Sequence, residues 1–70
     1  MNENMLRNLI EMKERPGGIT RDAFHEIFPD NKETWNDLAE LVDAGFAIPR
    51  YSDSMLQEIM MTQDALNFLG

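Results

Sequence analysis

Residues 38–48 read LAELVDAGFAI, and the hydrophobic period changes within this stretch. Up to Ala44, apolar residues recur at three- and four-residue spacing, which is typical of an amphipathic helix. After Gly45 they alternate at Phe46 and Ile48, as in a strand. Because glycine adopts the left-handed backbone that ends many helices, Gly45 is predicted to mark the point where a helix turns into a strand.

The helix before Gly45 is predicted to begin near Asp30 or Asn31, since both residue types are good N-caps. Asp30 and Glu33 have the spacing of a capping box, and Asn31 is a rival cap. The inward positions of this helix are predicted to be Trp35, Leu38, Ala39, Leu41 and Val42.

Two further helices are predicted upstream. Residues 5–12 show helical periodicity, and the Arg-Pro-Gly-Gly sequence of residues 15–18 ends that helix. Thr20 is a good N-cap for the next helix, in which Ile19 can pack on Phe24 as a hydrophobic staple. The buried stripe of this second helix is predicted to contain Ala23, Phe24, Ile27 and Phe28.

Downstream of residue 45 the sequence predicts a hairpin and a short helix. Pro49 has no backbone N–H to donate, which favours an edge strand. Residues 52–54 read Ser-Asp-Ser and predict a turn, after which residues 56–61 return as the second strand. Thr62 is then expected to cap a C-terminal helix of one or two turns.

This order of elements resembles the winged helix-turn-helix superfamily, in particular its compact MarR-like and ArsR-like domains. Residues 38–48 resemble the end of the family's recognition helix and its first wing strand. Residues 61–69, MTQDALNFL, are similar to its second wing strand and Thr-capped helix, with Ala65 where glycine is usual. The resemblance implies one mostly helical α+β domain over residues 1–70, with three helices, a two-stranded β-hairpin wing and a short C-terminal helix.

The charge of the chain departs from what such a domain needs to bind DNA. Residues 22–43 hold seven carboxylates and one lysine, and the net charge is −7. DNA binding depends on neutralising phosphates with Lys and Arg. We therefore expect the outward side of the third helix to bind a basic protein. Its predicted residues are Lys32, Glu33, Asn36, Asp37, Glu40 and Asp43.

A plainer interpretation of this acidic helix stays open. Charged residues on an exposed helix also keep a small protein in solution. However, like charges three or four residues apart destabilise a helix, and residues 33–43 contain no Lys or Arg to relieve the repulsion. A helix selected for stability alone would usually interleave the two signs.

The hairpin supplies a second candidate surface. Tyr51, Met55, Leu56 and Met60 are predicted to form an apolar patch on the wing. Such patches often mark self-association or the docking of a partner. The alternative is that the methionines fill the core.

Composition argues against most catalytic chemistry. The chain has no cysteine, a single histidine, and no nucleophile, phosphate-binding or zinc motif. We expect no enzymatic activity, cofactor or bound metal, and we expect His25 to be a surface or boundary residue. No apolar run is long enough for a membrane, and the start lacks the features of a signal peptide, so a cytoplasmic protein without membrane contact is expected.

Three hypotheses for function follow. The first is a protein-interaction module that acts as a small regulator or antagonist, such as a phage-encoded antirepressor or inhibitor, on a basic protein. The second is a transcriptional regulator that contacts DNA directly, and the third is a homodimerising structural or assembly subunit. The second hypothesis would depend on six basic residues: Arg7, Lys13, Arg15, Arg21, Lys32 and Arg50.

Overall fold

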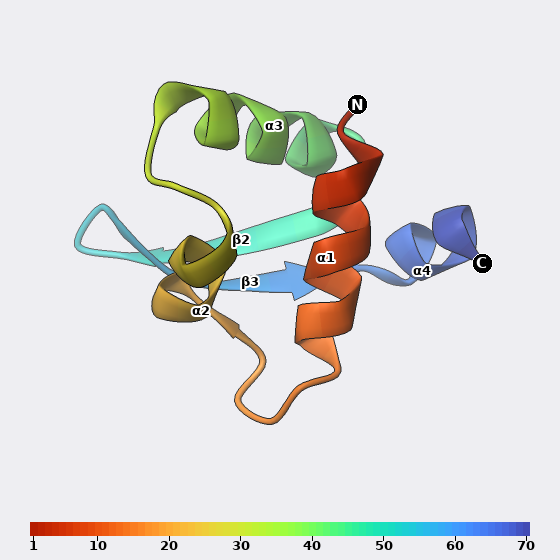
Figure 1. The fold of residues 1–70 in the computed structure, drawn as a ribbon, viewed down its shortest axis with the longest axis horizontal. Coiled ribbons are helices and arrows are strands. Elements are labelled where there is room, and N and C mark those ends of the chain that lie inside the picture. The colour runs from red at the N-terminus through yellow and green to blue at the C-terminus, as the bar shows by residue number, and fades with distance from the viewer.

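The structure, a computed structural model, describes residues 1–70 as an α+β fold of four helices and one antiparallel sheet. The elements in chain order are α1 (Glu3–Lys13), β1 (Ile19–Thr20), α2 (Arg21–Ile27), α3 (Lys32–Asp43), β2 (Ala47–Ser52), β3 (Met55–Met61) and α4 (Gln63–Leu69). Figure 1 shows α1 and α2 in front of the sheet, α3 above it, and α4 beyond the end of β3. The turn between β2 and β3 projects at the opposite end of the molecule from α4.

The sheet has three strands, with the order β1-β3-β2, and not the two that were predicted. In β1, Ile19 lies opposite Ile59 and Thr20 lies opposite Glu58. A two-residue strand is too short to show a period of two in the sequence. Thr20 is also the N-cap of α2, as predicted, with its Oγ1 accepting a hydrogen bond from the Ala23 N–H at 3.2 Å.

The N-cap of α3 is Asn31, whose side-chain oxygen accepts a hydrogen bond from the Thr34 N–H at 2.9 Å. The rival cap, Asp30, instead accepts a hydrogen bond from the indole N–H of Trp35 at 2.7 Å. The two neighbouring residues therefore have different roles. Asn31 caps α3, and Asp30 binds the side chain of Trp35 in the first turn of the helix.

The junction between α3 and β2 forms as predicted at Gly45, whose φ is +80°. The Phe46 N–H donates to the Leu41 carbonyl at 2.9 Å, which satisfies a carbonyl group at the end of the helix. Thr62 closes the base of the hairpin, because its Oγ1 donates to the Gly45 carbonyl at 2.7 Å. It also caps α4, as predicted, by accepting from the Ala65 N–H at 3.3 Å.

The β2–β3 hairpin turns at Asp53 and Ser54, which have φ of 52° and 64°. Two positive φ values in a two-residue loop match the turn that suits the twist of paired strands. β2 is an edge strand, as Pro49 predicted. A β-bulge interrupts the pairing between Arg50 and Tyr51 and leaves Gln57 as the extra residue of β3.

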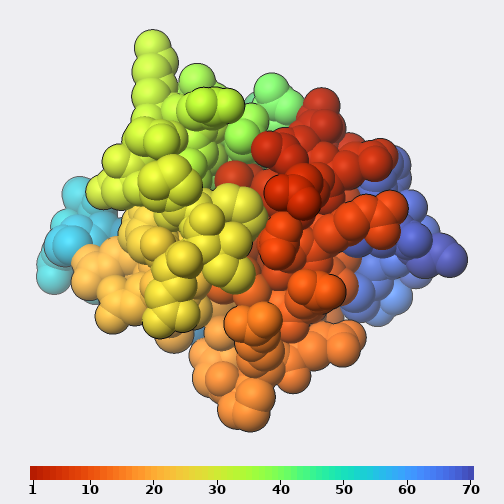
Figure 2. Space-filling view, viewed as in Figure 1, coloured from red at the N-terminus to blue at the C-terminus, as the bar shows by residue number.

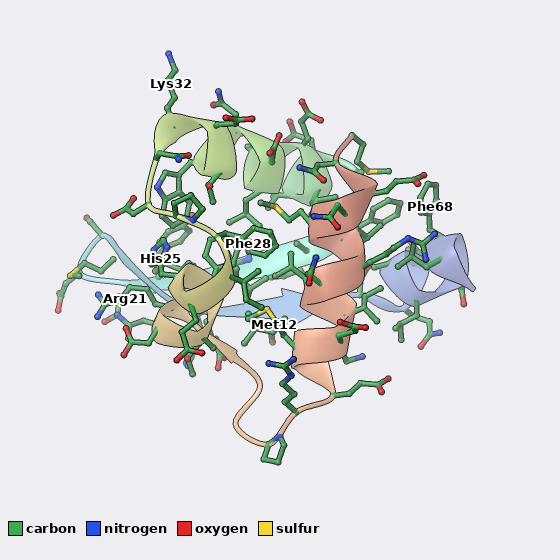
Figure 3. All side chains as sticks on the ribbon, in the orientation of Figure 1. Met12, Arg21, His25, Phe28, Lys32 and Phe68 are labelled. Atoms are coloured by element: carbon green, nitrogen blue, oxygen red, sulfur yellow. The ribbon has the colours of Figure 1, made fainter.

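Fourteen hydrophobic residues form one core between the helices and the sheet. They are Met5, Leu6, Leu9, Met12, Ile19, Phe24, Phe28, Leu38, Leu41, Ala47, Leu56, Ile59, Met61 and Ala65. Figure 3 shows Met12 and Phe28 pointing into this space from opposite sides.

Two residues expected inside, Ile27 and Ala39, are exposed instead, and Ile48 of the predicted first hairpin strand is exposed as well. Ile48 is 49% exposed because the strand alternation starts at Ala47, which turns Ala47 into the core and Ile48 outward. Ile27 is 41% exposed in the last turn of α2, just before the chain leaves the helix. Ala39 is exposed at the border of the buried side of α3, whereas Thr34, which the pattern did not place inside, is buried.

Candidate functional site

The predicted acidic surface occupies one side of α3. Five of its residues are exposed, and Asp37 is half-buried. The opposite side of the helix buries Thr34, Leu38 and Leu41. Lys32, the only basic residue of α3, points away from the molecule at the start of the helix (Figure 3). In the space-filling view α3 lies along the upper margin of the molecule (Figure 2).

Two of these acids have partners within the chain. The Asn2 side-chain amide donates to Asp37 Oδ2 at 3.0 Å, and the amino group of Met1 lies 3.4 Å from Glu40 Oε2. Glu33 and Asp43 take part in none of the three ion pairs of the structure. The two ends of the acidic side are therefore the carboxylates most available to another molecule.

Asp43 is also placed against the dipole of its own helix. It is the last residue of α3, and no basic residue lies in that turn. The C-terminus of a helix carries partial negative charge, so a carboxylate there is destabilising. The intrinsic stability of α3 therefore gives no reason for an acid at this position.

A groove of about 590 Å³ separates α3 from the β2–β3 hairpin. Figure 1 shows these two elements, with α3 above and the turn of the hairpin projecting to one side. The groove is lined by Trp35, Leu38, Ala39, Val42, Asp43, Pro49, Tyr51, Ser54 and Leu56. Its lining is mostly apolar, and Asp43 belongs both to the groove and to the acidic side of α3.

The sequence did not reveal this groove. Ala39 and Val42 were expected in the core, but Ala39 is exposed and Val42 is half-buried, and both form part of the wall. The only signal was the width of the apolar stripe on α3, which is broader than the sheet covers. No local pattern tells a core residue from a groove residue at the edge of such a stripe.

The apolar wing patch predicted from Tyr51, Met55, Leu56 and Met60 is not a single surface. Leu56 is 5% exposed and belongs to the core, so its inclusion was wrong. Tyr51, opposite Leu56 in the ladder, lines the groove. Met55 and Met60 are exposed, and Met60 lies opposite Ile48. The patch divides because neighbouring side chains of a strand point to opposite faces.

The wall of the groove at Trp35 is held in place from two directions. Its indole N–H is bonded to Asp30, and its ring lies 5.7 Å from that of Phe24, centroid to centroid. His25 packs edge-on against Trp35 at 5.3 Å. Nδ1 of His25 lies 3.0 Å from the Phe28 carbonyl oxygen, which can only accept, so this nitrogen carries the proton. His25 is half-buried between α2 and α3, in keeping with a boundary residue (Figure 3).

The basic residues are distributed differently from the acids. They come from α1, the connection after it, α2, α3 and β2. Arg50 Nε lies 2.9 Å from Glu58 Oε1, and Arg21 Nε lies 3.6 Å from Asp22 Oδ1. Two of the six are therefore already paired with carboxylates of this chain.

None of the four helices is long and apolar enough to cross a membrane. No group of three His, Asp or Glu side chains is placed to hold a metal ion. Comparison with protein-family models, with curated proteins and with solved structures gave no match for this chain.

Proposed function

We propose that this chain is a non-enzymatic interaction module of the winged helix-turn-helix type, and that the outward side of α3 binds a basic protein. Three helices followed by a hairpin and a short helix support the winged-helix assignment. In that assignment α3 corresponds to the helix that DNA-binding members lay into the major groove.

One observation carries the proposal. The exposed side of α3 carries Glu33, Glu40 and Asp43, and its only basic residue is the lysine at its first position. A phosphate backbone would be repelled by these carboxylates, whereas a basic surface would be attracted and steered toward them. The acid at position 43 costs helix stability, which favours a role in binding.

Basic surfaces of the kind proposed for the partner are typical of proteins that bind nucleic acid. An α3 with carboxylates in place of basic residues offers such a partner a row of negative charges, as DNA phosphates do. We therefore favour a small regulator or antagonist, of the antirepressor or inhibitor type, over a DNA-binding regulator.

Isothermal titration against a panel of basic DNA-binding proteins tests the proposal. Binding should weaken as salt is raised, and Glu33→Lys and Asp43→Lys should each weaken it further. Glu11→Lys is the matched control, since it makes the same change in net charge at an exposed position of α1. An affinity that does not change with salt concentration, and that all three variants reduce equally, would contradict the proposal.

The two alternatives give different results. A mobility shift of duplex DNA at low salt would favour a DNA-binding regulator, because non-specific affinity is greatest there. A tight homodimer in sedimentation experiments, without an outside partner, would favour an assembly subunit.

A further inference from the structure

We infer that the groove between α3 and the β2–β3 hairpin receives a large apolar side chain of the basic partner proposed above. The partner segment is then a basic peptide in which an aliphatic or aromatic residue is flanked by lysines or arginines. The apolar residue enters the groove, and the flanking cations meet the carboxylates of α3.

The dimensions and lining of the groove suit such an anchor. Its volume of about 590 Å³ lies within the range of protein pockets that bury small ligands. Trp35, Leu38 and Val42 line it from α3, while Pro49, Tyr51 and Leu56 line it from the hairpin. Tyr51 is 59% exposed, so a large aromatic surface stays in contact with solvent until a partner covers it.

The groove is also pre-organised, because the position of the Trp35 ring is fixed within the chain. Asp30 and Phe24 fix the ring of Trp35, so this wall loses little freedom when a ligand packs on it. Tryptophan and tyrosine are the residue types that dominate the energy of many protein interfaces. An apolar anchor should therefore add measurable affinity to the electrostatic attraction.

Charge selects a basic partner for this groove. Asp43 is the only charged residue in the lining. Arg50 lies between Pro49 and Tyr51 in β2, and its side chain is paired with Glu58 at 2.9 Å. Pro49 lines the groove, so Arg50 points to the opposite face of the sheet. No lysine or arginine of this chain therefore opposes an approaching cation within the groove.

The same charges disfavour a second copy of the chain as occupant. Each copy carries a net charge of −7, so docking one on the acidic helix of another brings like charges together. Duplex nucleic acid meets the same repulsion.

Trp35 supplies a direct reporter, because it is the only tryptophan in the chain and lines the groove. The probes are two short lysine-rich peptides of equal charge, one with a single central leucine and one with a serine in its place. The leucine peptide should shift the Trp35 indole N–H resonance in NMR spectra. It should also bind about tenfold more tightly than the serine peptide, because one good apolar contact typically contributes about this much affinity.

Ala39→Phe should abolish this tenfold preference, because its ring would occupy the groove without a change of charge. Asn67→Phe adds the same ring at an exposed position of α4, outside both the groove and the acidic side of α3, and it should keep the preference. Circular dichroism of both variants checks that the fold is retained. The comparison of the two peptides on the unmodified chain does not depend on either variant.

The outcomes separate this inference from the proposed function. Equal, salt-sensitive binding of both peptides would leave the basic partner in place and overturn only the role of the groove. Binding of neither peptide would contradict both. A homodimer, or a complex with duplex DNA, that Ala39→Phe disrupts would assign the groove to a different occupant and overturn the inference.

Discussion

The indole N–H of Trp35 donates a hydrogen bond to Asp30 Oδ1 at 2.7 Å, across the first turn of α3. This bond joins the loop before the helix to the wall of the groove. Asp30→Ala should therefore release the indole. We expect the free energy of unfolding to fall by about 0.5–1 kcal/mol, the lower part of the range for a hydrogen bond, because the pair is exposed.

Denaturant unfolding and the indole resonance of Trp35 measure the two effects of Asp30→Ala separately. Asp30→Asn keeps a side-chain oxygen as acceptor and should lie close to the unmodified chain. An indole resonance that does not move in Asp30→Ala would show that packing alone holds the ring.

The N-cap of α3 gives a second prediction. Asn31→Ala should lower the free energy of unfolding by about 1 kcal/mol, because the Thr34 N–H loses its acceptor. Asn31→Ser should recover most of the loss, since serine is a comparable cap. Thermal unfolding of both variants tests this, and a larger loss from Asn31→Ser than from Asn31→Ala would contradict the assignment.

Opposite ends of α3 should respond oppositely to the same exchange. Asp43→Lys should raise the free energy of unfolding by about 0.5–1 kcal/mol, because a cation at the helix C-terminus replaces an anion. Glu33→Lys, in the first turn, should lower the free energy of unfolding by a similar amount.

Both exchanges change the net charge equally, and both should weaken binding to a basic partner. Denaturant titrations at low salt measure their stabilities, and calorimetry measures the binding. If Glu33→Lys and Asp43→Lys change the free energy of unfolding in the same direction, overall charge repulsion outweighs the helix dipole.

Gly45 gives a prediction about backbone conformation alone. Its φ is +80°, and nothing lies within 4 Å of the place where a Cβ would be added. Gly45→Ala should therefore cost about 1 kcal/mol of stability, through the left-handed backbone and not through a clash. Gly45→Asn should cost less, because asparagine tolerates this conformation. Chemical denaturation of the two variants checks the order.

Features with a local cause could be predicted from the sequence. Thr20 and Thr62 cap helices through their own hydroxyls, and Gly45 ends α3 by its own backbone freedom. Pro49 marks an edge strand because it lacks an N–H. The exposure of the acids on α3 likewise follows from helical periodicity.

Features that depend on distant partners could not be predicted. The pairing of Ile19 with Ile59 joins residues forty positions apart, and a two-residue strand leaves no pattern of its own. The groove arises because α3 has more apolar surface than the sheet covers, a quantity that only the packed structure defines. The division of the wing residues depends on the strand register, which the bulge beside Tyr51 shifts.

Thr20 is both the last residue of β1 and the N-cap of α2. Fraying of this sheet edge therefore also removes the acceptor at the first turn of α2, so the two segments should open as one cooperative unit. In native-state hydrogen exchange, the amides of β1 and of the start of α2 should show a common opening free energy. The short strand would thus set the local stability of a helix that packs against α3.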